Sequence, residues 1–427
     1  MDYNRQVPLH SAWDVIVCGA GPSGIAASVA AARLGLRVML LERYGAVGGC
    51  LTLGNVSTVM GSVSPGTLRD EMARMLHSVD VARGIDCDAA KGILTQWLAR
   101  EGVAFRLQTP VVDALVDDGV IRGVFALTQQ GLAFFQGQRV IDATGDGFVS
   151  AMAGAQVMVG RDGDGLVQPC SLMYTIDGVE SDLVCNHEEH CTILPDGREY
   201  LALCREASRD GRLPPSVSIV RLYSTGVPGE RLVNATQVNG VCVLNDGDAE
   251  RAEVELRRQM AQVNDFLRRE IPSFAHIRLR TSASTLGVRE SRRIAGRYVL
   301  CAEDLLEGRR FDDAVVHAAN FPIDIHNPSG GGQAETEGCP HKARPYDIPM
   351  RALQPLGVEN LILSGRCISG SHRAHASYRV MNIAMAVGQA AGVMAAASLR
   401  DGVPVSRLNA ASVQALLRGQ GCVLTDA

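Results

Sequence analysis

The apolar positions of the chain begin with an unbroken run at residues 15–18, which predicts a buried parallel strand. Glycines follow it, and an alanine-rich stretch at residues 26–31 then predicts a helix that can lie close to a sheet. A second apolar run, residues 37–41, predicts another strand and stops at Glu42. This order of strand, glycines, helix, strand and acid is typical of an α/β fold that binds a dinucleotide.

Three glycines, Gly19, Gly21 and Gly24, stand at G-x-G-x-x-G spacing before the predicted helix. The first permits a tight turn, the second lets the backbone approach a pyrophosphate, and the third lets the helix pack on the strand. Pro22 suits the first helical turn, whose N–H groups and partial positive charge attract phosphates. Glu42 stands where such folds accept hydrogen bonds from a ribose diol, and an acid there disfavours a 2′-phosphate.

Further elements follow from the same pattern. Residues 68–77 and 89–100 have helical spacing, the second with Asp88 as its N-cap. Apolar residues at i, i+4, i+7 and i+11 predict an amphipathic helix over residues 249–271. Three alternating runs separated by polar turns predict a meander over residues 111–117, 120–128 and 132–141. Near the C-terminus, residues 361–363 predict a strand, and a helix rich in alanine and glycine begins near Arg379.

Composition and charge exclude several classes of function. The chain has 427 residues, 46% hydrophobic and 20% charged, which suits two domains of an ordinary globular protein. Its formal net charge of −5 gives no basic footprint for nucleic acid. The twelve cysteines contain no C-x-x-C pair. No apolar segment of a signal peptide stands at the N-terminus, and the apolar run at residues 383–399 is shorter than a membrane span. We therefore expect a cytoplasmic protein.

A family resemblance appears directly after Glu42, where the segment 43–49 ends in the pair Gly48-Gly49. With the motif before it, this segment resembles the FAD-dependent oxidoreductases among the glutathione-reductase-like flavoproteins. The resemblance implies that FAD is the cofactor and that the glycine pair lies near the isoalloxazine ring. Cys50 then faces the flavin, either as a reactive thiol or as a small buried side chain.

The resemblance continues in three later segments. It implies that a strand ending in Ala-Thr-Gly-Asp at residues 143–146 returns to the cofactor, and that the backbone near Val112 meets the adenine. It also matches a Gly-Arg-x-Ile-Ser segment at residues 365–369 and an Arg-Val-Met segment at residues 379–381, where a helix N-terminus favours a reduced, anionic flavin. The expected cofactor-binding residues are Gly19, Gly21, Pro22, Ser23, Gly24, Glu42, Arg43, Gly48, Gly49, Cys50, Val112, Ala143, Gly145, Asp146, Gly365, Arg366, Arg379, Val380 and Met381.

Candidate catalytic residues stand in the second half of the chain. Arg289 and Arg292 lie three apart on an expected helical face. There they clamp a substrate carboxylate, balance the charge of a reduced, anionic flavin, or belong to a structural ion-pair network. His326 is either an acid/base group or a loop anchor. His372, His375 and Tyr378 precede the alanine-rich helix near the C-terminus and are expected to line the substrate side. Either histidine then removes a substrate proton, or both belong to a solvated or hydrogen-bonded loop.

A dense group of potential metal ligands stands at residues 185–191, with two cysteines and two histidines. Its spacing matches no standard zinc site, so we expect a solvated loop there and no metal.

These observations predict an α/β protein with a discontinuous Rossmann-type FAD-binding domain, residues 1–155 and 346–427, and an inserted mixed α+β substrate domain, residues 156–345. No second dinucleotide unit is visible, which favours hydride transfer from a small-molecule substrate to flavin N5 by a dehydrogenase or oxidase. Two alternatives stay open: a reductase or monooxygenase fed by NAD(P)H or a partner protein, and a non-catalytic flavin-binding regulator. The electron acceptor is open among oxygen, a quinone and a partner protein, and a homodimer is compatible with the sequence.

Overall fold

The computed structural model describes residues 6–76, 84–185, 192–225, 227–331 and 341–424. A parallel sheet forms the larger half of the molecule. Its strands β3 (Ala104–Arg106), β2 (Val38–Leu41), β1 (Leu9–Cys18) and β6 (Gly131–Asp142) lie side by side in that order, and β15 (Leu361–Leu363) pairs with the end of β6. The predicted Rossmann-type α/β fold is confirmed.

Strand β6 pairs with β1 along one side and with two further strands along the other side. Its first half pairs antiparallel with β5 (Val120–Thr128), which in turn pairs with β4 (Val111–Asp117), so the predicted meander is present. Its second half pairs parallel with β15, with Leu361 opposite Val140. The chain therefore returns to the cofactor edge of the sheet twice, once at the end of β6 and once at the end of β15.

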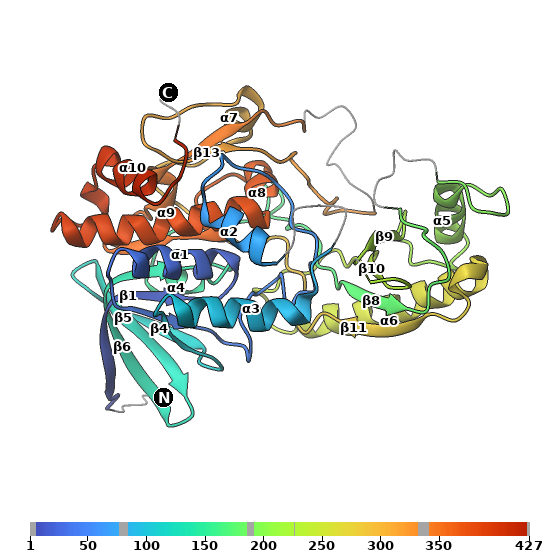
Figure 1. Ribbon diagram of the computed structural model, residues 1–427, viewed down its shortest axis with the longest axis horizontal. Helices are drawn as coiled ribbons and strands as arrows, with labels where there is room; N and C mark the ends of the chain where they lie inside the picture. Colours follow the sequence, from blue (N-terminus) through green and yellow to red (C-terminus); the bar gives the residue numbers. More distant parts are fainter. Residues whose placement is uncertain (1–5, 77–83, 186–191, 226, 332–340, 425–427) are drawn as a thin grey trace.

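Two helices lie beside each other on this sheet, α1 (Pro22–Arg33) and α9 (Met381–Arg400) (Figure 1). Gly388 and Gly392 allow the contact, because a Cβ atom there would lie 2.0 Å from the carbonyl oxygen of Ser23 and 2.2 Å from that of Ala27. Around them lie α2 (Leu68–Met75), α3 (Cys87–Arg100), α4 (Phe148–Met152) and α10 (Ala410–Gly419).

A second, antiparallel sheet forms the smaller half of the molecule, at the right of Figure 1. Its strands run in the order β11 (Arg278–Ser282), β8 (Tyr174–Asp177), β10 (Arg231–Asn234) and β9 (Arg221–Ser224). Helix α6 (Asp248–Glu270) buries the predicted apolar stripe, and α5 (Tyr200–Arg209) packs on the same core.

The remaining elements of the described chain are short. They are the strand pair β7 (Val157–Val159) and β12 (Arg292–Ile294), the pair β13 (Ala314–Ala319) and β14 (Tyr346–Pro349), the helices α7 (Ala302–Glu307) and α8 (His372–Tyr378), and the 3-10 turns Pro272–Phe274, Met350–Leu353, Gly365–Cys367 and Val405–Arg407.

The hydrophobic core is divided into two clusters. One joins residues 15–155 with residues 294–422, and the other lies within residues 170–283. The segment that we expected to be inserted, residues 156–345, contributes to both clusters, since residues 294–325 pack on the first.

The structure corrects two local expectations. Asp86 rather than Asp88 caps helix α3, because its carboxylate accepts hydrogen bonds from the N–H groups of Asp88 and Ala89. Arg289 and Arg292 do not share a helical face, because Arg292 begins strand β12 and Arg289 lies in the extended segment before it.

The expected solvated loop at residues 185–191 falls, after Cys185, outside the described residues. Within the described ranges, no group of three or more His, Cys, Asp or Glu residues has the geometry to hold a metal ion.

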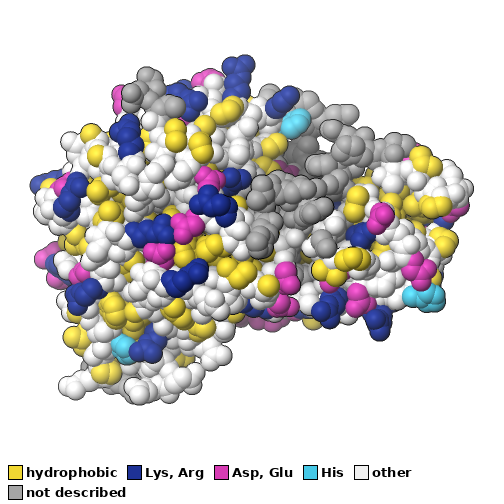
Figure 2. Space-filling view, in the orientation of Figure 1, with side chains coloured by type: hydrophobic (Ala, Val, Ile, Leu, Met, Phe, Trp, Pro, Cys, Tyr) yellow, Lys and Arg dark blue, Asp and Glu magenta, His cyan; other side chains and the backbone are white. Residues whose placement is uncertain are grey.

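Helix α9 is long and apolar enough to cross a membrane, but it is a buried core helix here, with 94% of its apolar window buried. On the surface, Figure 2 shows side chains of both charge signs scattered over the visible face.

Candidate functional site

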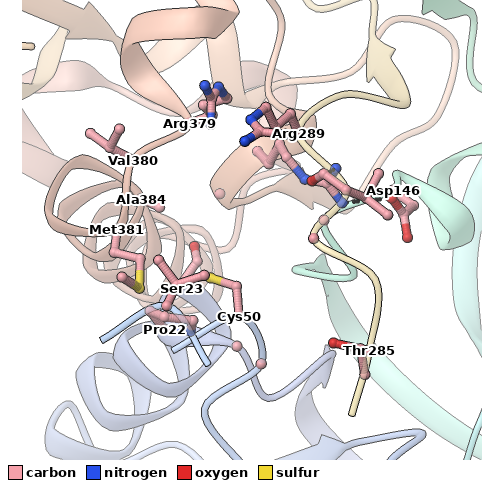
Figure 3. A pocket seen from close by; sticks show the side chains of 18 of the residues that line it. Pro22, Ser23, Cys50, Asp146, Thr285, Arg289, Arg379, Val380, Met381 and Ala384 are labelled. Carbon is pink, nitrogen blue, oxygen red and sulfur yellow. Dashed lines mark hydrogen bonds and ion pairs between the residues drawn. The ribbon is translucent and has the colours of Figure 1, made fainter. Parts of the chain in front are cut away.

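A cavity of about 1150 Å³ opens between the two halves of the molecule. Small-molecule sites usually occupy roughly 300–1,000 Å³, so this cavity has room for a large cofactor together with a second molecule. Its walls combine the ends of β1, β2 and β6, the N-termini of α1 and α9, and residues of β9 and β10 from the smaller half (Figure 3).

The turn after β1 forms the first wall. Gly19 has a φ of +102°, and a Cβ atom there would lie 2.5 Å from the carbonyl oxygen of Ala143. A Cβ atom on Gly24 would lie 1.8 Å from the carbonyl oxygen of Gly19, so Gly24 serves helix packing and does not line the cavity. Gly21, Pro22 and Ser23 line it at the N-terminus of α1, where first-turn N–H groups have no acceptor within the helix.

Glu42 lies at the end of β2 and lines the same wall. Its carboxylate accepts hydrogen bonds from the N–H groups of Ala20, at 2.6 Å, and Tyr44, at 2.9 Å. Burial raises the pKa of Glu42, while these two donors act against the rise. The side chain thus joins the glycine turn to the segment after β2 and presents an acceptor at the cavity.

The glycine pair comes next. Gly48 donates its N–H to the carbonyl oxygen of Ala20 at 2.7 Å and lies behind the cavity wall. Gly49 lines the cavity, and a Cβ atom there would lie 2.9 Å from the Cα atom of Gly21. Cys50 follows with its exposed surface turned into the cavity, and burial raises the pKa of its thiol. The thiol is therefore protonated at neutral pH.

An ion pair of Arg366 and Asp146 forms the cavity wall beside the end of β6. Arg366 donates a hydrogen bond to Asp146 at 2.6 Å, and Ser291 donates another at 2.7 Å. Arg43 lies 3.8 Å away from the same carboxylate. Burial favours a higher pKa for Asp146, but Arg366, Ser291 and Arg43 hold that pKa below its ordinary value. Asp146 is thus an ionised acceptor at the cavity, with Gly145 and Ala143 beside it.

The N-terminus of α9 faces the cavity from the opposite side. Val380 is its N-cap residue, without a side-chain hydrogen bond, and Val380, Met381 and Ala384 line the cavity (Figure 3). A helix of 20 residues places partial positive charge at this end. Gly365, with a φ of +75°, brings the end of β15 against Ser23.

These walls fit FAD. Two helix N-termini, an acceptor at Glu42 and a second acceptor at Asp146 match the phosphates, hydroxyls and electron-rich ring of a flavin dinucleotide. Glycines keep the wall open where a Cβ atom would meet backbone. The buried hydroxyl of Thr58 borders the cavity and has no hydrogen-bond partner in the described part of the chain.

A polar cluster occupies the end of the cavity nearest the smaller half. Arg379 donates to the carbonyl oxygen of Asp324 at 3.1 Å, and the carboxylate of Asp324 lies 3.5 Å from the same nitrogen. His326 lies 3.7 Å from that carboxylate. Arg289 donates to the carbonyl oxygen of Pro169 at 2.8 Å. The cluster brings together residues that are up to 90 positions apart, which is the distance from Arg289 to Arg379.

Burial and mutual repulsion lower the pKa values in this cluster. Burial, then the charge of Arg379, lowers the pKa of Arg289 to about 10. Burial, then Arg289 and Arg379, holds the pKa of His326 well below its ordinary value. Around neutral pH both arginines are therefore charged and the imidazole of His326 is neutral.

Three of the predicted catalytic residues lie away from the cavity. Helix α8 turns His372, His375 and Tyr378 into the protein interior, so the expectation that they line the substrate side is wrong. His372 hydrogen-bonds Glu290 at 2.9 Å through Nδ1, and Tyr378 donates to the carbonyl oxygen of Ile368 at 3.0 Å. Arg373, on the same helix, lines the cavity instead.

The arginine-rich segment at residues 289–293 also has some side chains at the cavity and others in the protein interior. Arg289 and Arg292 line the cavity, whereas Glu290 and Arg293 form a buried ion pair beneath them. Glu290 also accepts a hydrogen bond from the N–H of Gln168 at 3.0 Å. The expected ion-pair network is thus formed by Glu290 and Arg293, while Arg289 and Arg292 stay candidates for binding a substrate.

One predicted cofactor-binding residue does not line the cavity, and some residues that line it were not predicted. Val112 points outward and is 40% exposed, while Val111 lines the cavity, because successive side chains of a strand alternate. Arg221 and Tyr223 of β9 were missed, since no motif marks that strand. Asp324 stands two positions before His326, and a search for carboxylates near candidate bases could have found it.

This chain is similar to known flavoproteins, over most of its length in one comparison and over short segments in two others. A family model described as FAD dependent oxidoreductase matches residues 14–417. A dihydrolipoyl dehydrogenase from Trypanosoma brucei brucei is 43% identical over 53 residues, 12% of this chain and 11% of that protein. Another from Thermus scotoductus is 29% identical over 138 residues, 31% of this chain and 26% of that protein. The chain thus aligns with only a minor part of either relative.

Solved structures give alignments over nearly the whole chain. A geranylgeranyl bacteriochlorophyll reductase-like protein from Thermoplasma acidophilum has a TM-score of 0.48 and 12% identity, covering 96% of this chain and 82% of that one. The flavin-dependent brominase Bmp2 has a TM-score of 0.47 and 12% identity, covering 96% and 83%.

Proposed function

Because the chain belongs to the FAD dependent oxidoreductase family, whose model matches residues 14–417, we propose that it oxidises a small organic molecule as a dehydrogenase or an oxidase. The observation that carries the proposal is the continuity of the cavity. One space joins the cradle at Gly21 and Glu42 to the polar cluster at Arg289 and His326. A molecule bound at the cluster therefore shares the cavity with the cofactor.

FAD is held from three sides. The N-terminus of α1, Glu42 and Asp146 supply donors and acceptors for the dinucleotide, and the N-terminus of α9 supplies positive charge. When bound, FAD accepts a hydride, which is two electrons with one proton, from the carbon that is oxidised.

His326 takes the remaining proton in this proposal. Oxidation of an alcohol or an amine at carbon releases a hydride from carbon and a proton from oxygen or nitrogen. The imidazole of His326 is neutral around pH 7, so it has a lone pair to accept that proton. Asp324, 3.7 Å away, supplies negative charge that stabilises the resulting imidazolium.

The electron donor is the substrate itself in this proposal. In the residues that the structure describes, one strand–glycine–helix–strand unit borders the cavity. The other glycine run begins at Gly330, and its described part, residues 327–331, forms no strand or helix. A dedicated second site for NAD(P)H therefore has no support in these ranges, and a nicotinamide would have to enter the same cavity.

An anaerobic titration of the purified holoenzyme with NADH and then NADPH, followed by flavin absorbance, tests the proposal. We expect no bleaching by either nicotinamide, and full bleaching by dithionite. Rapid bleaching by a nicotinamide would overturn the proposal and favour a reductase or monooxygenase fed by NAD(P)H. If the flavin stays oxidised, small alcohols, amines and hydroxy acids are then screened as direct donors.

A further inference from the structure

The polar end of the cavity carries more positive than negative charge. Arg289 and Arg379 approach each other across it in Figure 3. The charge of Arg379 lowers the pKa of Arg289, and both charges lower the pKa of His326. Asp324 is the carboxylate that lies within ion-pair distance of Arg379. In the described residues, no carboxylate lies within that distance of Arg289. Asp324 also acts on Arg289 at longer range, but Arg221 adds a further positive charge that lowers the pKa of Arg289 and of His326. Positive charge therefore exceeds the negative charge of Asp324 at this end of the cavity.

Several donor atoms of the two guanidinium groups are left for a ligand. Arg289 uses Nη1 for the carbonyl oxygen of Pro169, and no acceptor for its Nε or Nη2 is found in the described ranges. Arg379 uses Nη2 for Asp324, while its Nε is buried without a hydrogen-bond partner. Burying a cation without a partner is costly, because water no longer solvates it. A bound anion would remove that cost at both residues.

The excess charge lies apart from the cradle that fits a pyrophosphate. Figure 3 shows Pro22 and Ser23, at the N-terminus of α1, on the other side of the cavity from Arg289 and Arg379. The phosphates of the cofactor are expected at α1. The anion that balances Arg289 therefore belongs to another molecule.

We propose that Arg289 and Arg379 form a carboxylate subsite and that the molecule oxidised is a small organic acid. The inference rests on the proposed function, since it names the class of its substrate. A guanidinium presents a planar pair of N–H donors that matches a carboxylate. One carboxylate balances the charge left by the two arginines and Asp324, whereas a phosphate dianion would meet more repulsion from Asp324.

The neighbouring walls fit the rest of such a molecule. Phe321, Ile323 and Leu286 line the same cavity and offer apolar surface, which suits a short carbon chain or a ring. His326 lies in the same cluster, so a carboxylate held by the arginines would keep the adjoining carbon near the residue proposed as base. The carboxylate would also compensate the cations that hold the pKa of His326 low.

The test uses binding to the FAD-loaded protein rather than turnover. Propionate and benzoate are titrated by isothermal calorimetry at constant ionic strength, with propionamide, benzamide and inorganic phosphate as matched probes. We expect both carboxylates to bind and the amides and phosphate to bind more weakly by about tenfold or more, the usual effect of losing a charged hydrogen bond. Equal binding of the amides, stronger binding of phosphate, or no binding of either carboxylate overturns the inference.

Variants locate the subsite. Arg289→Met and Arg379→Met are each expected to weaken benzoate binding about tenfold or more, and Arg289→Lys to weaken it less because the charge remains. Arg278→Met, at a side chain that is 80% exposed on β11, is the control and should not change it. The ratio of flavin to protein absorbance shows that each variant is folded and loaded. Unchanged binding in both methionine variants overturns the assignment.

This experiment separates the two proposals. Carboxylate binding that depends on Arg289, together with rapid bleaching by NADH, would overturn the proposed direction of electron flow and leave the subsite in place. Flavin reduction by a neutral amine or alcohol, without carboxylate binding, would overturn the subsite and leave the proposed dehydrogenase or oxidase in place.

Discussion

Gly388 of helix α9 faces the carbonyl oxygen of Ser23 in helix α1 so closely that a Cβ atom at position 388 would lie 2.0 Å from that oxygen. Both helices begin at the cavity, so this contact sets the spacing of the two N-termini. We expect Gly388→Ala to push the helices apart and to lower the free energy of unfolding by about 1–3 kcal/mol. Urea denaturation measures the loss, and the fraction of FAD kept after dialysis reports the altered cavity.

Gly92→Ala is the matched control for that change. Gly92 lies within helix α3, is exposed, and a Cβ atom there meets nothing within 4 Å. Alanine in an open helical position is expected to raise the free energy of unfolding by about 0.5–1 kcal/mol. If both variants change the free energy of unfolding by the same amount, the close contact of α1 with α9 does not explain the effect of Gly388→Ala.

Glu42→Gln is expected to weaken FAD binding. The carboxylate accepts from two backbone N–H groups, of Ala20 and Tyr44, with its two oxygens. An amide has one oxygen, so its NH₂ group would face one of these donors and displace the wall of the cradle. Losing a charge-assisted hydrogen bond costs about 1.5–3 kcal/mol, which corresponds to roughly a 10- to 150-fold weaker FAD affinity.

Fluorescence of released FAD gives the dissociation constant for this variant. Glu71→Gln is the control, because Glu71 pairs with Arg33 on helix α1 outside the cavity. Its FAD affinity should equal that of the unmodified protein. An unchanged dissociation constant in Glu42→Gln would show that the carboxylate does not support the cofactor.

The first strand–helix–strand unit could be predicted from the sequence because each of its steps is local. The turn at Gly19, the helix start at Pro22 and the acid at Glu42 follow one another within a short stretch, and each depends on backbone geometry that one residue type favours. The meander and strand β15 could be predicted for the same reason, since alternation and turn residues mark them.

The substrate end of the cavity could be predicted only in part. Its residues come from β9, from the segment at Asp324 and from the turn before α9, and tertiary packing alone brings them together. Helix α8 shows the difficulty, because its histidines stand beside Arg379 in sequence but point into the core. A rotation of a short helix decides which side chains face a cavity, and local sequence does not encode that rotation.

The rate of flavin reduction is expected to fall only at unusually low pH. Burial, with Arg289 and Arg379, holds the pKa of His326 well below the ordinary value near 6.5. If His326 is the base, the second-order rate constant of flavin reduction, measured below saturation with the donor, reports the ligand-free site. It stays constant as the pH falls through about 6.5 and declines only at lower pH. Stopped-flow reduction by a direct donor measures this profile.

His326→Gln should reduce that rate by about 10²- to 10⁴-fold at every pH on the plateau. A decline centred near pH ~6.5 would show that another group, or an exposed imidazole, controls the step. A variant that keeps the rate of flavin reduction would remove His326 from the proposed mechanism.

His375 is expected to make the fold sensitive to acid. Both of its ring nitrogens are buried without a hydrogen-bond partner in the described part of the protein. Its ring packs edge-on against that of Tyr378, with the ring centroids 5.5 Å apart. Burial, then the charges of Arg293 and Arg379, holds its folded-state pKa well below the ordinary value. In the unfolded chain that pKa is near 6.5.

The sign of the effect follows from proton binding. Below about pH 6.5 the unfolded state binds a proton at His375 that the folded state refuses, so the free energy of unfolding falls as the pH falls through that value. His375→Leu removes this linkage, and its stability should decline less than that of the unmodified protein between about pH 7 and about pH 5. Urea denaturation at both pH values measures the difference. His276→Gln, at an exposed histidine outside the core, is the control and should keep the full decline.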